Sequence, residues 1–379
     1  MGDISIRIGQ FGLWQTRIVS ILGLFGIFNG LQKLSLTFTL KETDFWCSSS
    51  SAELKMEVQP KNFPKLINCD MVEHGAIIPC SRWDYERTAY PETAISQFNL
   101  VCENQYGVAL SQTVYLDGYV VGAFASGIFS DKFGRRPAIL LSAVSYLVCS
   151  LFVAFSPSIV IFNILHWLSA VSVLSLYNAS FTYCMEIVGG KWVTIVSVLF
   201  GICPSLGFIS ATLISSVFPR WTDFQLTLPI IFLLLPLSVP GFLIDSPRWL
   251  VANEFLEEAE YVVKKAAERN SIPYKENLES ENTTNGSTAS LKDLFLTPYL
   301  LGTTLVLAYI FTVFLSTYNG VIMNSEKFIP GNLVMNIDVL AFLEIVASLT
   351  AILAIMYVKR RTSGSLCFPI TSISFLILT

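Results

Sequence analysis

Charged residues are scarce in this sequence: they make up 14% of its 379 residues and leave a net charge of -4. Ordinary soluble domains carry roughly 25% charge, so most of this chain is expected to avoid water. The charge balance gives no indication of a nucleic-acid partner. Histidine is rarer still, and the only two, His74 and His166, show no ligand spacing with the eight cysteines. The sequence therefore indicates no metal site, and without a nucleophile motif it predicts neither an enzyme nor a cofactor.

Hydrophobic residues, in contrast, make up 53% of the chain, and the mean hydropathy is +0.59. They gather in runs that each approach the roughly 20 residues a helix needs to cross about 30 Å of hydrocarbon. A further apolar run, 365–379, is too short to cross at about 1.5 Å per residue, so we expect the sequence to be incomplete at its C-terminus. We predict an all-α membrane protein whose spans cover residues 17–40, 106–129, 138–155, 159–185, 192–218, 226–244, 299–319 and 333–358.

The loops between these spans differ in charge. Lysine and arginine concentrate in alternate loops, which are expected to face the cytoplasm together with residues 1–16. Residues 17–244 are then predicted to form a six-helix bundle, and residues 299–379 a partial second bundle. Residues 41–105 form a long outer loop, and residues 245–298 form an inner loop that includes an amphipathic helix. We expect a multi-pass protein of the plasma membrane.

Four of the eight cysteines fall in the outer loop: Cys47, Cys69, Cys80 and Cys102. An even number of cysteines in an oxidising compartment predicts two disulfides. Four cysteines allow three pairings, and the sequence does not choose among them.

Several motifs carry a resemblance to a known family. The inner loop at 127–136 reads Gly-Ile-Phe-Ser-Asp-Lys-Phe-Gly-Arg-Arg, and the segment 245–250 reads Asp-Ser-Pro-Arg-Trp-Leu. These resemble the G-x-x-x-D-R-x-G-R-R and E-S-P-R-W-L motifs of the major facilitator superfamily. The outer loop reads Cys-Ser-Arg-Trp-Asp-Tyr at 80–85 and Gln-Phe-Asn-Leu-Val-Cys at 97–102, and the N-terminus reads Gly-Gln-Phe-Gly-Leu-Trp-Gln at 9–15. These segments resemble the organic cation transporter-like branch.

The resemblance implies a fold of two six-helix halves, with the N-terminal half complete here and the C-terminal half partial. It implies a transporter that moves small organic ions, either organic cations or carnitine-like zwitterions, across the lipid bilayer by alternating access. The alternatives are a truncated, non-transporting membrane protein, or a transporter of another solute class such as organic anions or sugars. The residues that match the family's substrate cavity are Glu344, Tyr177, Phe181, Phe311 and Tyr318, with Asn319 as a weaker addition.

The resemblance also implies gating roles for residues in and near the inner motifs: Asp131, Gly134, Arg135, Arg136, Glu186 and Arg248. In the family, the acidic residue of the first motif faces the eleventh helix, which this sequence does not contain. We therefore expect Arg135 to pair with Glu186 and Asp131 to stay solvated.

Ionisable side chains inside a bilayer are costly and usually functional, which singles out Asp117, His166 and Glu344. A desolvated Glu344 attracts a cation strongly, whereas the structural alternative is a protonated glutamate that joins two helices. Asp117 is expected either to line the cavity or to be capped by a neighbouring side chain. His166 stands where the family usually has arginine, so a titratable group replaces a permanent charge.

Overall fold

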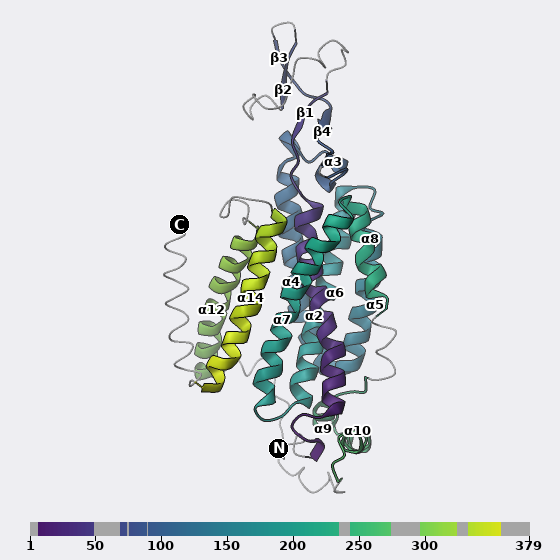
Figure 1. The fold of residues 1–379 in the computed structure, drawn as a ribbon, viewed down its shortest axis with the longest axis vertical. Coiled ribbons are helices and arrows are strands. Elements are labelled where there is room, and N and C mark those ends of the chain that lie inside the picture. The colour runs from purple at the N-terminus through teal and green to yellow at the C-terminus, as the bar shows by residue number, and fades with distance from the viewer. Residues whose placement is uncertain are drawn as a thin grey trace. The chain divides into compact units, whose positions relative to one another are not determined.

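The chain divides into two compact units, which contain the helices and strands of Figure 1. We call Ile21–Thr182 with Leu206–Leu243 the central unit, and Met1–Ser20 with Tyr183–Ser205 and Ile244–Thr379 the terminal unit. The short run predicted at 365–379 and His74 lie outside the described residues. The structure is a computed structural model, and it describes residues 7–48, 69–73, 76–88, 90–234, 243–273, 296–323 and 333–357.

Each predicted span is matched by a helix. In the described part of the chain, the helices α2, α5, α6, α7, α12 and α14 are long and apolar enough to cross a membrane. The helices that match the predicted spans are α2 (Leu13–Thr39), α4 (Tyr106–Phe133), α5 (Arg135–Val153), α6 (Ile159–Ile187), α7 (Trp192–Val217), α8 (Trp221–Phe232), α12 (Pro298–Met323) and α14 (Leu333–Tyr357).

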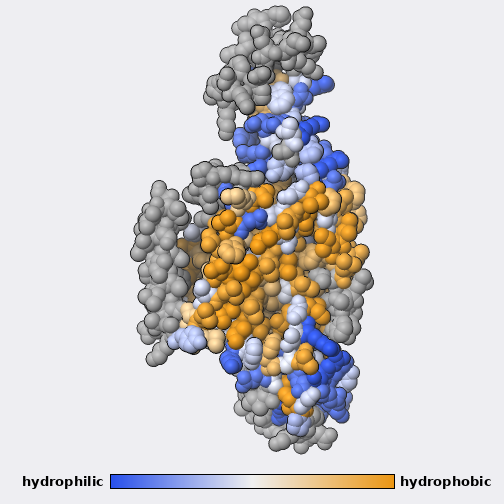
Figure 2. All heavy atoms as spheres, viewed as in Figure 1, coloured by the Kyte–Doolittle hydropathy of each residue, from blue (hydrophilic) through white to orange (hydrophobic). Residues whose placement is uncertain are grey.

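The side chains of α4 are distributed in the way that a lipid solvent requires. Large apolar residues point outward, with Val120, Phe124 and Ile128 each more than half exposed. On the face drawn in Figure 2, hydrophobic residues cover the flanks of the long helices and hydrophilic residues gather near the outer strands. Small and polar residues pack inside instead, as is typical of membrane helices. The buried residues of α4 recur every three or four positions: Gly107, Ser111, Tyr115, Gly118, Gly122, Ser126 and Ser130.

Two glycines allow α4 to approach α6 closely. A Cβ atom on Gly118 would lie 2.8 Å from the carbonyl oxygen of Trp167, and one on Gly122 would lie 2.7 Å from that of Val171. Ser175 uses this proximity to donate a hydrogen bond to the carbonyl of Gly122 at 3.1 Å. Larger residues at these positions would force the helices apart.

The outer loop is a small disulfide-bonded fold. Strands β1 (Phe45–Cys47) and β4 (Trp83–Tyr85) pair antiparallel, as do β2 (Asp70–Glu73) and β3 (Ala76–Pro79). The prediction of two disulfides among the four outer cysteines is confirmed. The structure also selects the pairing that the sequence left open, because one disulfide joins Cys47 to Cys80 and the other joins Cys69 to Cys102.

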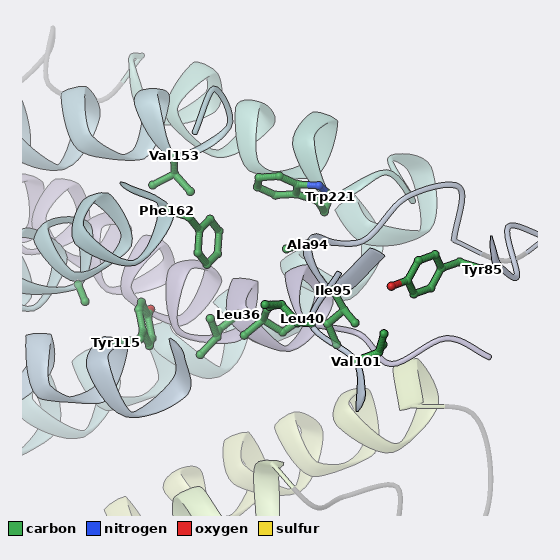
Figure 3. Close-up of a cluster of buried hydrophobic side chains, with 12 residues drawn as sticks. Leu36, Leu40, Tyr85, Ala94, Ile95, Val101, Tyr115, Val153, Phe162 and Trp221 are labelled. Carbon is green, nitrogen blue, oxygen red and sulfur yellow. The ribbon is translucent and has the colours of Figure 1, made fainter. Parts of the chain in front are cut away.

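Within the central unit, a short helix, α3 (Ala94–Phe98), packs the outer loop against the long helices. Thr93 and Ser96 form a capping box at its start. Figure 3 shows the cluster beneath it, where Trp221, Phe162, Leu36 and Ile95 come together from α8, α6, α2 and α3. At its outer end Tyr85 donates a hydrogen bond to the side-chain oxygen of Asn99 at 3.2 Å, and burial raises the pKa of its phenol to about 12.

The sixth predicted span begins earlier than expected. We placed its start at residue 226, where the apolar run begins, but α8 starts at Trp221. Contacts with the outer loop hold this polar first turn in the helix. Arg220 forms an ion pair with Glu92 at 2.8 Å, and the indole N–H of Trp221 donates to the side-chain oxygen of Gln97 at 2.9 Å.

In the terminal unit, α9 (Pro247–Ala252) begins inside the motif at 245–250, and α10 (Leu256–Arg269) follows it. Helix α10 is amphipathic, with alanines and valines on its buried face. Tyr183, near the end of α6, donates to the carbonyl of Ile244 at 2.8 Å, so residues 183–205 group with the C-terminal part of the chain. A boundary between the units lies between Leu243 and Ile244, next to the boundary predicted at 244, but the terminal unit also includes Met1–Ser20 and Tyr183–Ser205.

The residue that caps α10, Asn270, also binds the start of α2. Its side-chain oxygen accepts from the backbone N–H of Trp14 at 3.0 Å, and its side-chain nitrogen donates to the carbonyl of Ile8 at 2.6 Å and to Gln15 Oε1 at 2.8 Å. A side chain on Gly12 would occupy the position of the Asn270 amide. A glycine at the helix start cannot cap the first turn with a side chain, so Asn270 supplies the cap from a distant part of the chain.

Candidate functional site

The structure brings together two of the predicted substrate residues, Tyr318 of α12 and Glu344 of α14. The Tyr318 hydroxyl lies 3.2 Å from Glu344 Oε1 and 3.3 Å from Oε2, and both side chains are partly buried. One turn earlier on α12, the ring of Phe314 stacks on that of Tyr318 at a centroid distance of 6.3 Å and an angle of 14°. A carboxylate beside aromatic rings within an apolar span is an arrangement that attracts organic cations.

The other predicted substrate residues lie elsewhere. Phe311 is on α12 and is 60% exposed. The side-chain nitrogen of Asn319 donates to the carbonyl of Leu315 at 2.8 Å, so one of its donors is used within its own helix. Tyr177 and Phe181 lie one turn apart on α6 of the central unit, and both are partly buried.

Asp117 and His166, the other ionisable residues predicted inside spans, both contact neighbouring helices. The indole N–H of Trp167 donates to Asp117 Oδ2 at 3.0 Å. His166 is 1% exposed, and its Nε2 lies 3.2 Å from the side-chain nitrogen of Gln32 on α2. Its imidazole also meets the ring of Tyr115 at 4.7 Å, with the two planes nearly perpendicular.

The inner motif at 127–136 forms a tight corner between α4 and α5. Gly134 ends one helix and begins the next with φ of 100°, a conformation that residues with a Cβ rarely adopt. Beside it, Arg135 forms an ion pair with Asp131 at 3.0 Å and donates to the carbonyl of Ser130 at 2.8 Å. The side chain of Asp131 is 77% exposed, in keeping with the expectation that it stays solvated, and it also pairs with Arg135, which was not expected. The corner places these side chains one turn apart, which is close enough for a local ion pair.

The remaining predicted gating residues differ in exposure. Arg136 and Glu186 are partly buried, and Arg248 at the start of α9 is exposed. Arg135 keeps only 9% of its side chain exposed, whereas Asp131 keeps 77%. An ion pair with one partner this exposed to solvent contributes about 1 kcal/mol or less to stability. The pair of Asp131 and Arg135 therefore helps to fix the geometry of the turn between α4 and α5 more than it stabilises the fold.

Two further ionisable residues inside the spans were not predicted as site residues from the sequence. Lys33 lies in the interior of α2 and Asp338 near the start of α14, and both are partly buried. The criterion that singled out Glu344, an ionisable side chain within an apolar run, applies equally to them. No group of three or more potential metal ligands occurs among the described residues.

These features define a multi-pass α-helical membrane protein in which a carboxylate and aromatic rings are in contact inside the spans. A model of the sugar (and other) transporter family matches residues 81–379. The chain belongs to this family of membrane transporters, which are not enzymes, and the predicted major facilitator fold is confirmed.

The relatives of the chain agree with the branch that the motifs indicate. The chain is 26% identical to solute carrier family 22 member 3 of Rattus norvegicus, with 98% of this chain aligned to 74% of that protein. It is 27% identical to organic cation/carnitine transporter 2 of Mus musculus, with coverage of 96% and 72%. Among solved structures, the proton:xylose symporter XylE shares the fold with a TM-score of 0.58 at 14% identity, over 92% of this chain and 70% of that one.

Proposed function

We propose that this transporter carries small organic ions by alternating access, with organic cations or carnitine-like zwitterions as its substrates, and that it resides in the plasma membrane. The observation that carries the proposal is the pair of Glu344 and Tyr318 inside the spans of the terminal unit. The likeness to organic cation and carnitine transporters supports the same substrate class.

The pair leaves Glu344 able to bind a cation. An ionised carboxylate has about four acceptor positions, and a tyrosine hydroxyl donates one hydrogen. In the described part of the chain, the hydrogen bonds to Glu344 come from Tyr318 alone. The remaining positions are free to accept an ammonium group, and a stacked ring contributes about 0.5–1 kcal/mol or more through its electron-rich face.

A test compares Glu344→Gln with the parent protein in uptake of tetraethylammonium and of a neutral probe of similar size. Removing the charge is expected to cost the cation about 2 kcal/mol, the lower end of the range for a buried pair, because Glu344 is partly exposed. That corresponds to roughly a 30-fold loss of affinity. Glu344→Asp, which keeps the charge, should retain most of the uptake. An equal loss for both probes would show that Glu344 is a structural residue.

Lys33 favours a second substrate class, organic anions, because a cationic side chain within a span attracts negative charge. An anionic probe in the same assay discriminates between the two classes. If uptake of the anion is reduced in Lys33→Met but unchanged in Glu344→Gln, organic anions are favoured over organic cations as the substrates.

A further inference from the structure

Four helices of the central unit meet at a polar cluster that is shielded from solvent. The cluster combines residues of α2, α4, α5 and α6, and every member is at most 1% exposed. Its members are Gln32, Ser35, Tyr115, Tyr146, His166 and Ser169.

The side-chain amide of Gln32 connects α2 to α5 and α6 through directed hydrogen bonds, and Tyr115 of α4 donates to the main-chain carbonyl of Gln32 at 2.6 Å. The amide oxygen accepts from the hydroxyl of Tyr146 at 3.1 Å. The amide nitrogen donates to Ser169 Oγ at 3.3 Å and lies 3.2 Å from His166 Nε2. An amide nitrogen only donates, so Nε2 of His166 acts as the acceptor and the ring proton lies on Nδ1. In the described part of the chain, that buried Nδ1 has no hydrogen-bond partner.

The other groups around the imidazole are neutral hydroxyls and rings. From α4 it meets Tyr115, whose hydroxyl lies 3.2 Å from that of Tyr119, and from α2 it meets Ser35 at 3.5 Å. From its own helix it meets the ring of Phe162 at 5.1 Å. The carboxylate of Asp117 accepts a hydrogen bond from the indole of Trp167, the residue that follows His166. The hydrogen-bond partners of the imidazole among the described residues therefore include no carboxylate.

We propose that His166 is a proton-binding site whose protonation reverses the orientation of the Gln32 amide. A proton added to the lone pair of Nε2 makes both ring nitrogens donors, and Nε2–H then faces the amide nitrogen, which is also a donor. Turning the amide over places Oε1 against Nε2–H and the nitrogen against Tyr146. The hydroxyl of Tyr146 can both donate and accept, so it keeps its bond to the reversed amide. The hydroxyl of Ser169 now donates its single hydrogen to the carbonyl of His166 at 2.7 Å, and in the reversed arrangement it exchanges that bond for one to Gln32 Oε1.

Protonation thereby changes the hydrogen bonds that join α2 to α5 and α6. In one state Tyr146 donates to Gln32, and in the other it accepts. The cluster is a two-state element in the interior of the central unit, and proton binding selects between its states. This role is independent of the substrate class proposed above.

Nuclear magnetic resonance of nitrogen-labelled histidine tests the proposal without a substrate. The chain has two histidines, so His74→Gln in the outer loop leaves His166 as the single signal. Near neutral pH we expect a neutral ring protonated on Nδ1, and on acidification a ring protonated on both nitrogens. A neutral ring protonated on Nε2, or a ring that does not titrate while the protein stays folded, would overturn the proposal.

Gln32→Glu supplies a second test, because a carboxylate accepts from Nε2–H. His166 should then remain doubly protonated at a pH where the parent ring is neutral. Unchanged titration in this variant would contradict the predicted link between the two residues. In uptake assays at equal surface expression, we expect acidification to change uptake by the parent protein but not by His166→Gln. An equal change in both proteins, or no change in the parent, would contradict the proposal.

Discussion

Replacing Asn270 with alanine removes three side-chain hydrogen bonds that join the end of α10 to the start of α2. Each such bond contributes about 0.5–1.5 kcal/mol, and loss of a helix N-cap alone costs about 0.5–2 kcal/mol. Because the bonds are partly buried, we expect Asn270→Ala to lower the free energy of unfolding by about 2–4 kcal/mol. The backbone bonds that cap α10 are retained in this variant.

The assay is thermal unfolding of the purified protein in detergent, followed by tryptophan fluorescence. Trp192 is a suitable reporter because its ring stacks on Phe11 at 4.6 Å beside the same segment. The matched control is Asn253→Ala, since Asn253 also caps a helix but makes one exposed side-chain bond, to the carbonyl of Trp249 at 2.9 Å. Equal midpoints for the two variants would refute the idea that Asn270 caps α2.

Two further predictions concern helix packing and the outer loop. Gly122→Ala should lower the free energy of unfolding by about 1–3 kcal/mol, because the added Cβ atom would clash with the carbonyl of Val171. The control is Gly127→Ala, whose added Cβ atom would have no atom within 4 Å, so it should be neutral or stabilising in the same unfolding assay. An equal effect of both would argue against close packing of α4 and α6. Burial raises the pKa of the Tyr85 phenol in the folded protein, so the folded state holds this proton more tightly than the unfolded state does. The stabilisation that the protonated phenol contributes is therefore complete below pH 10.0 and is lost as pH rises to about 12. Tyr85→Phe should remove that part of the alkaline decline, and an unchanged pH profile would contradict it.

The spans followed from sequence because the signal that makes them is local. A run of apolar residues of sufficient length is stable across a bilayer whatever its neighbours are, so helices were predicted where the structure has them. The exception shows the limit of this rule. The first turn of α8 is polar, and it is helical because Glu92 and Gln97 of the outer loop bind Arg220 and Trp221.

Motifs likewise predicted local geometry but not partners. The glycine of the inner motif indicated a tight turn, and Gly134 makes one, yet the ion pair between Asp131 and Arg135 depended on how that corner is shaped. Four outer cysteines predicted two disulfides, while the choice among three pairings required the register of the outer strands.

Residues far apart in the chain were joined only by the tertiary structure. His166 stood out as a lone ionisable residue in an apolar run, but Gln32, which lies 134 positions away, carries no such signal. Asn270 caps a helix that begins more than 250 residues earlier, and nothing near either position marks the other. Hydropathy and turn chemistry act on neighbours in sequence and therefore determined the spans and corners. Buried polar groups must find partners in space, and packing alone decided which partners those are.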